Sequence, residues 1–378
     1  MKPIRIVRIA SVRNDRHGGM SRTMYLNGDC LRDLGFEVHY VFADQFSWPF
    51  KGGWSRFSQP IESGIRALAA EKQLQSCDLV EVHESLAIGC GAARAVLRRP
   101  WKLVAFSYGI ERLGFDAMCE YRLSHGVRVP LKSRVVGAVQ CEVSCLGLKF
   151  CDHIVCSNQK DVEQLVSAGY DRQMLTRHFS GVDEQMLEMG KLGCSHGNGG
   201  ILFLGTWIDR KGVWDVAPAV TRILRDIPHS FFTAAGCLIE EKEVLAQFPE
   251  DVRGRVRVIR RLSGHEQLAA TYHEHSVFLL PSYFEGQPLV MMEAAAFGLA
   301  IVTTPVCGML DFIQPGRNGL FVPVGDPAAI HQAVSRLLNS PDEARMLGAA
   351  ARQDVVRHTW RESAINLAKA YKGLLGRE

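Results

Sequence analysis

The chain has 378 residues, and its 44 lysines and arginines against 40 aspartates and glutamates leave a formal net charge of +4. At roughly 150 residues per domain, this length predicts two or three domains, and two is the simplest organisation. A hydrophobic fraction of 47% with 22% charged residues suits a globular chain and excludes disorder over most of its length. The 35 glycines show no triplet period, which excludes a collagen-like fibre.

The sequence shows neither a membrane-spanning segment nor a secretory signal. No run of about 18 apolar residues occurs, and Arg5 and Arg8 interrupt the apolar stretch near the start, which the core of a signal peptide would not tolerate. We therefore expect a cytoplasmic protein. The 11 cysteines are scattered, and the densest group lacks zinc-ligand spacing, so we expect small buried apolar side chains and no metal site at Cys141, Cys145, Cys151 and Cys156.

The first half of the chain alternates predicted strands with predicted helices. Apolar runs rich in β-branched residues predict strands at 4–10, 37–42, 78–82, 103–106 and 153–156. Helical spacing predicts helices at 20–34 and 88–97, and Asn158 is a suitable cap for a helix at 159–168. Strands that alternate with helices specify a parallel sheet with helices on both faces.

A polar, glycine-rich segment at 191–200 is typical of a linker, and the alternation restarts after it. The predicted strands lie at 201–204, 230–235, 256–260, 277–280 and 300–303. The predicted helices lie at 213–225, 264–273, 289–297, 328–338 and 361–374. The sequence therefore predicts an α/β protein with two doubly wound, Rossmann-like domains that leave a cleft between the carboxyl ends of their sheets.

The densest chemistry follows the predicted strand at 277–280. Glu285 falls in a loop before the helix at 289–297, Pro288 suits the first helical position, and Glu293 falls in the second turn. A helix N-terminus presents N–H groups and partial positive charge, which suits a phosphate. The two carboxylates suit the hydroxyls of a ribose and a sugar ring, or they are acids that the helix dipole favours.

Other segments extend this pattern. Glu285 and Glu293 form an E-x7-E pair, and residues 205–212 form a G-x5-K-G segment after a strand. With the segments 17–19, 179–183, 303–308, 318–326 and 358–360, they resemble the retaining GT-B glycosyltransferases of family four, the "group 1" type. The resemblance covers nearly the whole chain and is most specific over residues 201–330.

This resemblance implies the GT-B architecture. Residues 1–190 would form the acceptor-side domain and residues 191–359 the domain that binds a nucleotide-diphosphate sugar. A terminal helix at about 360–378 would pack back on the first domain. The two Rossmann-like domains would face each other across the cleft.

Carried over position by position, the resemblance also implies roles for single residues. Glu293 would bind the donor ribose, Glu285 the hydroxyls of the transferred sugar, and Lys211 the departing diphosphate. Further donor contacts would come from the glycine loop and the loop before the helix: Gly18, Gly19, Gly286, Gln287, Pro288 and Leu289. A cation and a helix N-terminus stabilise a departing diphosphate without a metal, so we expect no metal or other cofactor.

Two positions depart from the family pattern. Thr206 stands in the donor site where the family usually has an arginine, and Arg210 is the candidate for the second cation. Tyr108 stands at a histidine position that contacts the sugar near the reacting centre. Tyrosine donates a hydrogen bond, but its pKa of about 10 makes it a poor base. We expect catalysis to persist and the choice of donor sugar to depend on these two positions.

Three other classes compete with this interpretation. A nicotinamide-dependent oxidoreductase would carry a G-x-G-x-x-G motif after the first strand, and none occurs there. A nucleotide-sugar epimerase of similar fold would release free sugar. A non-catalytic nucleotide-sugar-binding protein would fit the departures at Thr206 and Tyr108. The favoured hypothesis is transfer of a hexose, with retention, from a UDP- or GDP-sugar to a glycan or lipid-linked acceptor, as in the synthesis of a cell-surface polysaccharide or lipopolysaccharide, with no nucleic-acid partner.

Two stretches of the first half suggest a membrane surface. Residues 44–60 carry five aromatic side chains near Lys51 and Arg56 and are predicted as an extended loop, which suits a membrane, a sugar platform, or simple packing on the first domain. Residues 122–134 form a second basic stretch. The sequence predicts peripheral association with an anionic membrane, and the alternative is a solvated helix face on a wholly soluble enzyme.

Overall fold

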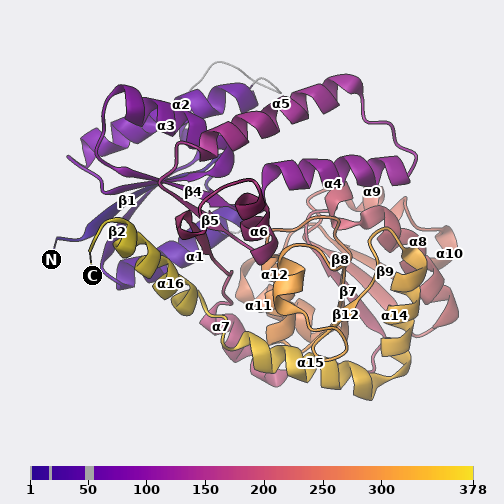
Figure 1. Cartoon of the computed structure of the whole chain (residues 1–378). Helices are drawn as coiled ribbons and strands as arrows, with labels where there is room; N and C mark the ends of the chain where they lie inside the picture. Colours follow the sequence, from indigo (N-terminus) through magenta and orange to yellow (C-terminus); the bar gives the residue numbers. More distant parts are fainter. Residues whose placement is uncertain (1, 17–18, 47–54, 378) are drawn as a thin grey trace. The chain divides into compact units, whose positions relative to one another are not determined.

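The computed structural model describes residues 2–16, 19–46 and 55–377 (Figure 1). The chain forms two compact units. The first unit comprises Met1–Asp116, Val129–Ser180 and Trp360–Glu378, and the second comprises Ala117–Arg128 and Gly181–Thr359. Each unit contains one parallel sheet of six strands, which confirms the α/β class.

The sheet of the first unit has the strand order β2-β1-β3-β4-β5-β6. Its strands are β1 (Ile4–Ile9), β2 (Phe36–Val41), β3 (Leu79–His83), β4 (Lys102–Ser107), β5 (His153–Cys156) and β6 (Leu175–Arg177). Its helices are α1 (Gly19–Asp33), α2 (Ser55–Gln73), α3 (Ala87–Val96), α4 (Glu111–Ser124), α5 (Leu131–Leu148), α6 (Gln159–Ser167) and α16 (Trp360–Leu374), and the second half of α4 belongs to the second unit. Short 3-10 turns lie at Ala43–Gln45, Glu84–Leu86 and Arg172–Met174.

Both faces of this sheet are covered by helices, as its uninterrupted apolar strands require. Alternate strand residues such as Ile6 and Leu79 pack with α1 and α16 in one core. Their neighbours Val7 and Val80 pack with α2, α3, α5 and α6 in another. Asn158 caps α6 by accepting a hydrogen bond from the Asp161 N–H at 2.8 Å, which confirms the predicted cap.

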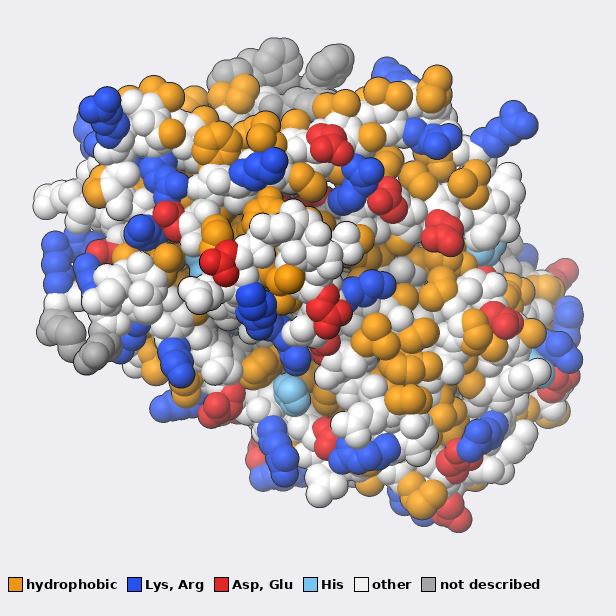
Figure 2. Space-filling view, viewed as in Figure 1, with side chains coloured by type: hydrophobic (Ala, Val, Ile, Leu, Met, Phe, Trp, Pro, Cys, Tyr) orange, Lys and Arg blue, Asp and Glu red, His pale blue; other side chains and the backbone are white. Residues whose placement is uncertain are grey.

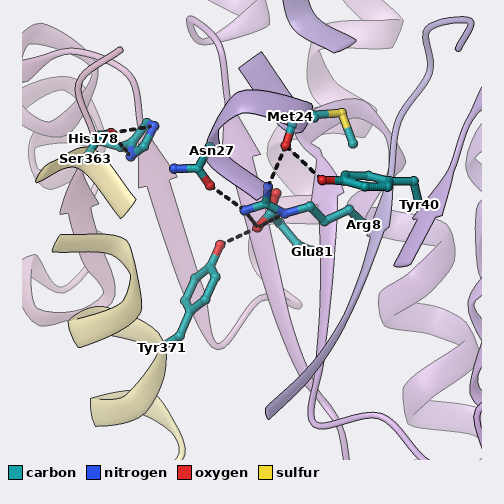
Figure 3. Close-up of polar contacts among 8 residues, drawn as sticks. All are labelled: Arg8, Met24, Asn27, Tyr40, Glu81, His178, Ser363 and Tyr371. Atoms are coloured by element: carbon teal, nitrogen blue, oxygen red, sulfur yellow. Dashed lines mark hydrogen bonds and ion pairs between the residues drawn. The ribbon is translucent and has the colours of Figure 1, made fainter. Parts of the chain in front are cut away.

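An arginine in the middle of β1 ties α1 to the sheet (Figure 3). Arg8 is 1% exposed and donates to Glu81 of β3 at 3.1 Å. It also donates to the Met24 carbonyl at 3.0 Å and to Asn27 Oδ1 at 2.8 Å, both in α1. The Tyr371 hydroxyl of α16 donates to the same Glu81 carboxylate. Because every charge in this buried cluster has partners, the cost of desolvating the ion pair is offset.

Helix α16 is anchored a second time near its start. Ser363 is buried and lies 3.2 Å from His178, and it donates to the Phe179 carbonyl. Burial, followed by the charge of Arg8, lowers the pKa of His178 to about 3, so the ring is neutral. The last helix is therefore an integral part of the first unit.

The sheet of the second unit has the strand order β12-β11-β10-β7-β8-β9. Its strands are β7 (Gly200–Leu204), β8 (Phe231–Ala235), β9 (Val256–Ile259), β10 (Val277–Leu280), β11 (Ala300–Thr303) and β12 (Leu320–Phe321). Its helices are α7 (Glu184–Met189), α8 (Val213–Asp226), α9 (Glu241–Leu245), α10 (Glu250–Arg253), α11 (Gly264–His273), α12 (Leu289–Ala296), α13 (Gly308–Phe312), α14 (Pro327–Asn339) and α15 (Pro341–Val355). Two short 3-10 turns, η5 (Gly190–Leu192) and η6 (Asp209–Lys211), precede β7 and α8.

The units divide at a different place from the predicted boundary at residue 190. Residues 181–190 belong to the second unit, because Val182 bonds to the His358 carbonyl at 2.8 Å and Met186 is fully buried in that core. The predicted linker at 191–200 likewise contains the end of η5 and the first residue of β7.

The prediction of an extended loop over 44–60 is wrong at its end. Helix α2 begins at Ser55 and contains Pro60, and its packing against α3, with Ala67 fully buried, overrides the weak helical signal of an internal proline. The aromatic residues at 47–54 lie outside the described residues. The basic stretch 122–134 is likewise not one helix face, since it contains the end of α4, a connection and the start of α5.

Among the helices that the structure describes, none is both long enough and apolar enough to cross a bilayer. Three of the clustered cysteines, Cys141, Cys151 and Cys156, are buried as predicted, and Cys145 is half-buried. Burial, reinforced by the charge of Glu111, raises the pKa of the Cys141 thiol to about 12.

Candidate functional site

The predicted site residues of the second unit meet where its strand order reverses. Ligands of doubly wound sheets bind outside the carboxyl ends of the strands at such a point. The reversal lies between β7 and β10, which pair side by side. The segment after β7 carries Arg210 and Lys211, and the segment after β10 carries Glu285. Two motifs that are 74 residues apart therefore share one edge of the sheet.

Two glycines explain the G-x5-K-G spacing. Gly205 has a φ of +148°, and a Cβ there would come within 3.0 Å of Lys211 Cε. Gly212 has a φ of +72°, and a Cβ there would come within 2.2 Å of the Pro281 carbonyl oxygen. Both positions favour glycine because of their backbone conformation as well as their contacts. The glycines therefore let the lysine lie across the end of β7 and let η6 approach the loop after β10.

Glu285 is buried and lies between two cations. Lys211 Nζ donates to one carboxylate oxygen at 2.6 Å, and Arg210 Nη1 lies 3.1 Å from the other. Ser282 Oγ donates to Oε1 at 3.1 Å. Burial by itself raises the pKa of Glu285, but the charges of Lys211 and then Arg210 outweigh it and lower the pKa to about 2. The cluster is therefore ionised at neutral pH, and two cations with one carboxylate leave one net positive charge.

In the structure, Lys211 and Arg210 both pair with Glu285, a partner that the sequence did not assign to them. The expectation placed Lys211 and Arg210 on a diphosphate and Glu285 on a sugar, whereas the structure joins all three. Lys211 is 11% exposed at its side chain, but Arg210 is 32% exposed. The arginine therefore keeps a solvent-facing side, although it also donates to the Phe284 carbonyl at 2.7 Å.

Helix α12 begins beside this cluster. Pro288 is extended, with a φ of −76° and a ψ of 116°, so it precedes the first turn and does not form its first residue as predicted. Pro288 is the N-cap residue, and its side chain makes no capping hydrogen bond. Gly308 packs closely against the loop before α12, since a Cβ at Gly308 would come within 2.1 Å of the Gly286 carbonyl oxygen. The positive end of the α12 dipole, at Leu289, thus lies next to a cationic cluster.

Glu293 lies one turn into α12 and is 3% exposed. The Tyr272 hydroxyl donates to Glu293 Oε2 at 2.9 Å. Tyr272 in turn stacks on Phe297, with ring centroids 5.1 Å apart. Tyr272 comes from α11 and orients the carboxylate, and it belongs to none of the motifs that the sequence shows.

The remaining predicted residues occupy other places. Thr206 follows Gly205 in the loop after β7 and is half-buried. Tyr108 belongs to the first unit, where its ring stacks on Phe106 at 4.7 Å and burial, with the charge of Glu81, raises the pKa of its hydroxyl. Gly19 begins α1, and Gly18 lies outside the described residues.

Residues 117–128 support the site in a way that no local motif revealed. Tyr121 is fully buried, and its hydroxyl accepts a hydrogen bond from the Trp214 N–H at 3.2 Å. Arg122 pairs with Asp209 of η6 at 2.9 Å, and His125 lies 3.0 Å from Asp215 of α8. These contacts join residues about 90 positions apart in the chain, and they hold the turn that carries Lys211.

The arrangement suits one kind of ligand. Lys211, Arg210 and the start of α12 concentrate positive charge at one point, which suits the oxygens of a phosphate. The ionised Glu285 and the buried Glu293 are acceptors, which suit hydroxyl groups. A molecule with both features is a phosphate ester that carries several hydroxyls.

Part of the chain matches a known family of proteins. Residues 198–340 match the family model Glycosyl transferases group 1. A glycogen synthase of Mycobacterium tuberculosis is 30% identical over 173 residues, which are 45% of this chain and 42% of the synthase. The chain therefore spans less than half the length of this curated relative.

Solved structures match over nearly the whole chain. A sucrose-phosphate synthase from Thermosynechococcus elongatus has a TM-score of 0.76 at 18% identity, covering 98% of this chain and 99% of that one. Anabaena HepE, in complex with UDP and glucose, has a TM-score of 0.67 at 13% identity, covering 96% of this chain and 98% of that one. These likenesses show that the chain has the GT-B fold.

Proposed function

We propose that the protein is a retaining glycosyltransferase that moves a hexose from a nucleotide-diphosphate sugar to an acceptor hydroxyl, because residues 198–340 match the family model Glycosyl transferases group 1. The observation that carries the proposal is the cluster of Lys211, Arg210 and Glu285 beside the start of α12. Likeness to proteins whose structures hold UDP and glucose supports a nucleotide-sugar donor.

The proposed chemistry concerns the bond between the sugar and the diphosphate. When this bond breaks, negative charge develops on the phosphate oxygens, and fixed positive groups lower the barrier most where that charge appears. Lys211, Arg210 and the first turn of α12 are proposed to supply such groups, and the two cations are held together by their ion pairs with Glu285. Because Glu285 stays ionised, it accepts hydrogen bonds from sugar hydroxyls throughout the reaction.

The nucleoside end of the donor is assigned to Glu293. A ribose presents two neighbouring hydroxyls, and a buried carboxylate held by Tyr272 is oriented to accept hydrogen bonds from them. Thr206 and the backbone from Gly286 to Leu289 are proposed as further donor contacts. Tyr108 is proposed to contact the transferred sugar, and Gly18 and Gly19 are proposed as further donor contacts.

A thermal-shift screen tests the proposal directly. UDP, GDP and their glucose and mannose conjugates are added to the wild type, to Lys211→Ala and to Lys242→Ala, which changes an exposed lysine of α9. A ligand that binds only the folded protein at one hundred times its Kd stabilises it by about 2.7 kcal/mol. We expect one nucleotide series to raise the Tm of the wild type and of Lys242→Ala, and to raise that of Lys211→Ala much less.

Two outcomes would redirect the assignment. Conversion of the donor to an epimer or free sugar, without a glycoside product, would identify an epimerase. Nucleotide-sugar binding with no turnover would identify a binding protein. If no nucleotide stabilises the wild type, the proposed donor site is wrong.

We further propose that the enzyme works in the cytoplasm and visits an anionic membrane, where its acceptor is a lipid-linked or cell-surface-glycan precursor. Arg128, Lys132 and Arg134 are exposed, and each basic residue near an anionic surface contributes about 1 kcal/mol. Sedimentation with vesicles that contain phosphatidylglycerol tests this. We expect salt-sensitive binding, lost when these three residues become glutamine and kept when the exposed Arg222, Lys242 and Arg261 do. Equal binding by both triple variants, or none by the wild type, would contradict it.

A further inference from the structure

The first unit has a strand reversal of its own, between β1 and β3. A cavity of about 720 Å³ lies there, bordered by α2, α3, α4 and α5 and by the segments that follow β1 and β3. Of the residues assigned to the donor, none that the structure describes lines it. It is therefore a separate site that the proposed donor chemistry does not use.

The walls of this cavity are largely apolar. Ile61 of α2, Ile88 of α3, Phe115 of α4 and Val143 of α5 line it, and all four are at least partly exposed. Ile61 is 56% exposed at the edge. Apolar side chains that face an open cavity gain free energy when a hydrocarbon covers them.

Two glycines set the width of the cavity. A Cβ at Gly137 of α5 would come within 2.1 Å of the Phe115 ring. A Cβ at Gly89 of α3 would come within 1.5 Å of the Pro60 carbonyl oxygen. Both glycines line the cavity, so α3 and α5 pack closely against their neighbours at its border.

One end of the cavity is polar. The hydroxyls of Ser11 and Ser85 each lie 3.1 Å from Nδ1 of His83. Burial lowers the pKa of His83, so its ring is neutral and this nitrogen is either a single donor or a single acceptor. One nitrogen cannot satisfy two hydroxyls at once, so a serine hydroxyl is available to a ligand.

The Glu111 carboxylate at the polar end of the cavity determines which polar group a ligand can place there. Glu111 accepts a hydrogen bond from Ser144 at 2.6 Å, and its other carboxylate oxygen has no partner within the described residues. Among the residues that the structure describes, no lysine, arginine or histidine lines the cavity. A phosphate would meet a carboxylate with no cation to balance it, whereas an uncharged hydroxyl group can donate to Glu111.

The surface around the cavity is apolar too. Ile61 and Ile65 are exposed on α2, and Leu131, Val135 and Val139 are exposed at four-residue spacing on α5. Figure 2 shows hydrophobic side chains gathered on this side of the first unit with basic ones among them. Such a surface suits contact with a hydrocarbon phase.

We propose that this cavity binds a neutral glycolipid, with its hydrocarbon chain along Ile61, Ile88, Phe115 and Val143 and its hydroxylated head at Ser11, Ser85 and Glu111. The inference rests on the proposed transferase function, since it names the chemical class of the acceptor. The combination of an apolar wall, paired hydroxyls and an uncompensated carboxylate separates this class from lipid phosphates and from free sugars.

Equilibrium titration with octyl and decyl glucoside, each below its micelle concentration, tests the inference. Each buried methylene adds about 0.8 kcal/mol, an affinity ratio of about four, so the decyl compound should bind about tenfold more tightly or better. Glucose and decyl phosphate should each bind at least tenfold more weakly than decyl glucoside. The absence of chain-length dependence, or equal binding of decyl phosphate, would overturn the proposal.

Variants locate the site. Val143→Trp fills the cavity, and Ile61→Asp places a charge at its exposed edge in case the tryptophan variant does not fold. Ile65→Trp is the matched control, because Ile65 is exposed on the same helix and does not line the cavity. We expect at least a tenfold loss of decyl glucoside affinity in the first two and no change in the control. Equal affinity in all three would place the glucoside elsewhere and overturn the assignment.

The same samples are also titrated with the nucleotide series. Loss of glucoside binding with an intact nucleotide response is expected for the cavity variants. A wild type that binds decyl glucoside but no nucleotide would overturn the transferase function. A wild type that binds nucleotide but no glucoside would overturn only the cavity assignment.

Discussion

The two strand reversals of this chain share a topology and differ in electrostatics. At the β7/β10 reversal, Lys211 and Arg210 lie on the ionised Glu285. At the β1/β3 reversal, the cavity is lined by apolar side chains, serines, glutamines and Glu111, and no described residue of its lining is a cation. The fold thus provides the same kind of site twice, and the side chains decide which ligand chemistry each site accepts.

Two buried carboxyl groups sharpen this contrast. Glu84 follows β3 and is 1% exposed, and it accepts hydrogen bonds from the Ser107 hydroxyl at 2.8 Å and the Glu111 N–H at 3.3 Å. Burial first, and then the charge of Glu111, raise its pKa to about 8. Glu285 is equally enclosed, but its two cations lower its pKa to about 2. One carboxyl group therefore keeps its proton at neutral pH, and the other does not.

The largest expected effect concerns Glu84. Its folded pKa lies above the unfolded value, so between about pH 5 and pH 8 the unfolded chain loses a proton that the folded chain keeps, and stability falls as pH rises. From pH 5 to pH 8, the unfolding free energy of Glu84→Gln should therefore rise by about 4 kcal/mol relative to that of the wild type. Hydrogen exchange of peptides from β3 and β4 at both pH values measures this difference.

One control variant and a second carboxyl group test the sign of this effect. Glu163→Gln changes an exposed carboxylate of α6 and should show no such trend. Glu285 should act in the opposite direction, because its lowered pKa contributes stability above about pH 4.5 that is lost as the pH falls toward 2. If the wild type and Glu84→Gln keep a constant difference from pH 5 to 8, Glu84 is ionised and the contrast between the two carboxyl groups fails.

Lys211→Ala is expected to have the largest effect on catalysis. Removing one fixed group that stabilises developing charge lowers kcat by about 10²–10³-fold. Arg210→Ala should cost less, because Arg210 is more exposed than Lys211. Initial rates of sugar transfer, at nucleotide-sugar concentrations well above KM, measure both effects.

The relative size of the two effects tests the assignment of Lys211 and Arg210. Should Arg210→Ala abolish transfer while Lys211→Ala has a mild effect, the assignment of the two cations is reversed. Lys242→Ala serves as the control and should keep wild-type rates.

A smaller effect is expected for Glu293→Gln. This change keeps the shape of the side chain and removes the charge that a ribose hydroxyl would meet, so nucleotide binding should weaken by about 1–3 kcal/mol. Isothermal titration with the nucleoside diphosphate measures it, and Tyr272→Phe, which removes the orienting hydroxyl, should have a lesser effect in the same direction. Unchanged affinity in Glu293→Gln would remove the ribose assignment.

The smallest expected effect is that of chelation. Because Lys211, Arg210 and the start of α12 supply the positive charge, we expect transfer rates in excess EDTA to stay within experimental error of those without it. A loss of activity that manganese or magnesium restores would show that these groups do not suffice.

Much of the fold follows from local pattern. The strands β10 and β11 and helix α11 match the predicted ranges, since a short apolar run or one helical period identifies them. Helices α2, α4 and α5 were not predicted. Pro60 and the aromatic residues obscured α2, and in α5 apolar residues lie on an exposed side as well as along the cavity, which blurs the helical period.

In the candidate site, too, the sequence predicts the residues that belong to local motifs and does not predict their distant partners. Contiguous motifs predicted that Lys211 and Glu285 follow strands and that Glu293 lies on a helix. Their partners did not, because Tyr272 and the pair His125–Asp215 come together only through the fold. The ion pair that fixes the charge of Glu285 is equally long-range, so its lowered pKa was beyond any local pattern.

The anchoring of α16 has a consequence for synthesis on the ribosome. Glu81 and Tyr371 are partners that are separated by 290 residues. At translation rates of about 5–20 residues per second, the strand that holds Glu81 emerges roughly 15–60 s before the helix that covers it. The sheet face that α1 and α16 share thus stays only partly covered while the second unit, which ends at Thr359, acquires its full sequence. The unit that is made first is therefore the one that is completed last, and its nascent form is a natural client for a chaperone that shields apolar surface.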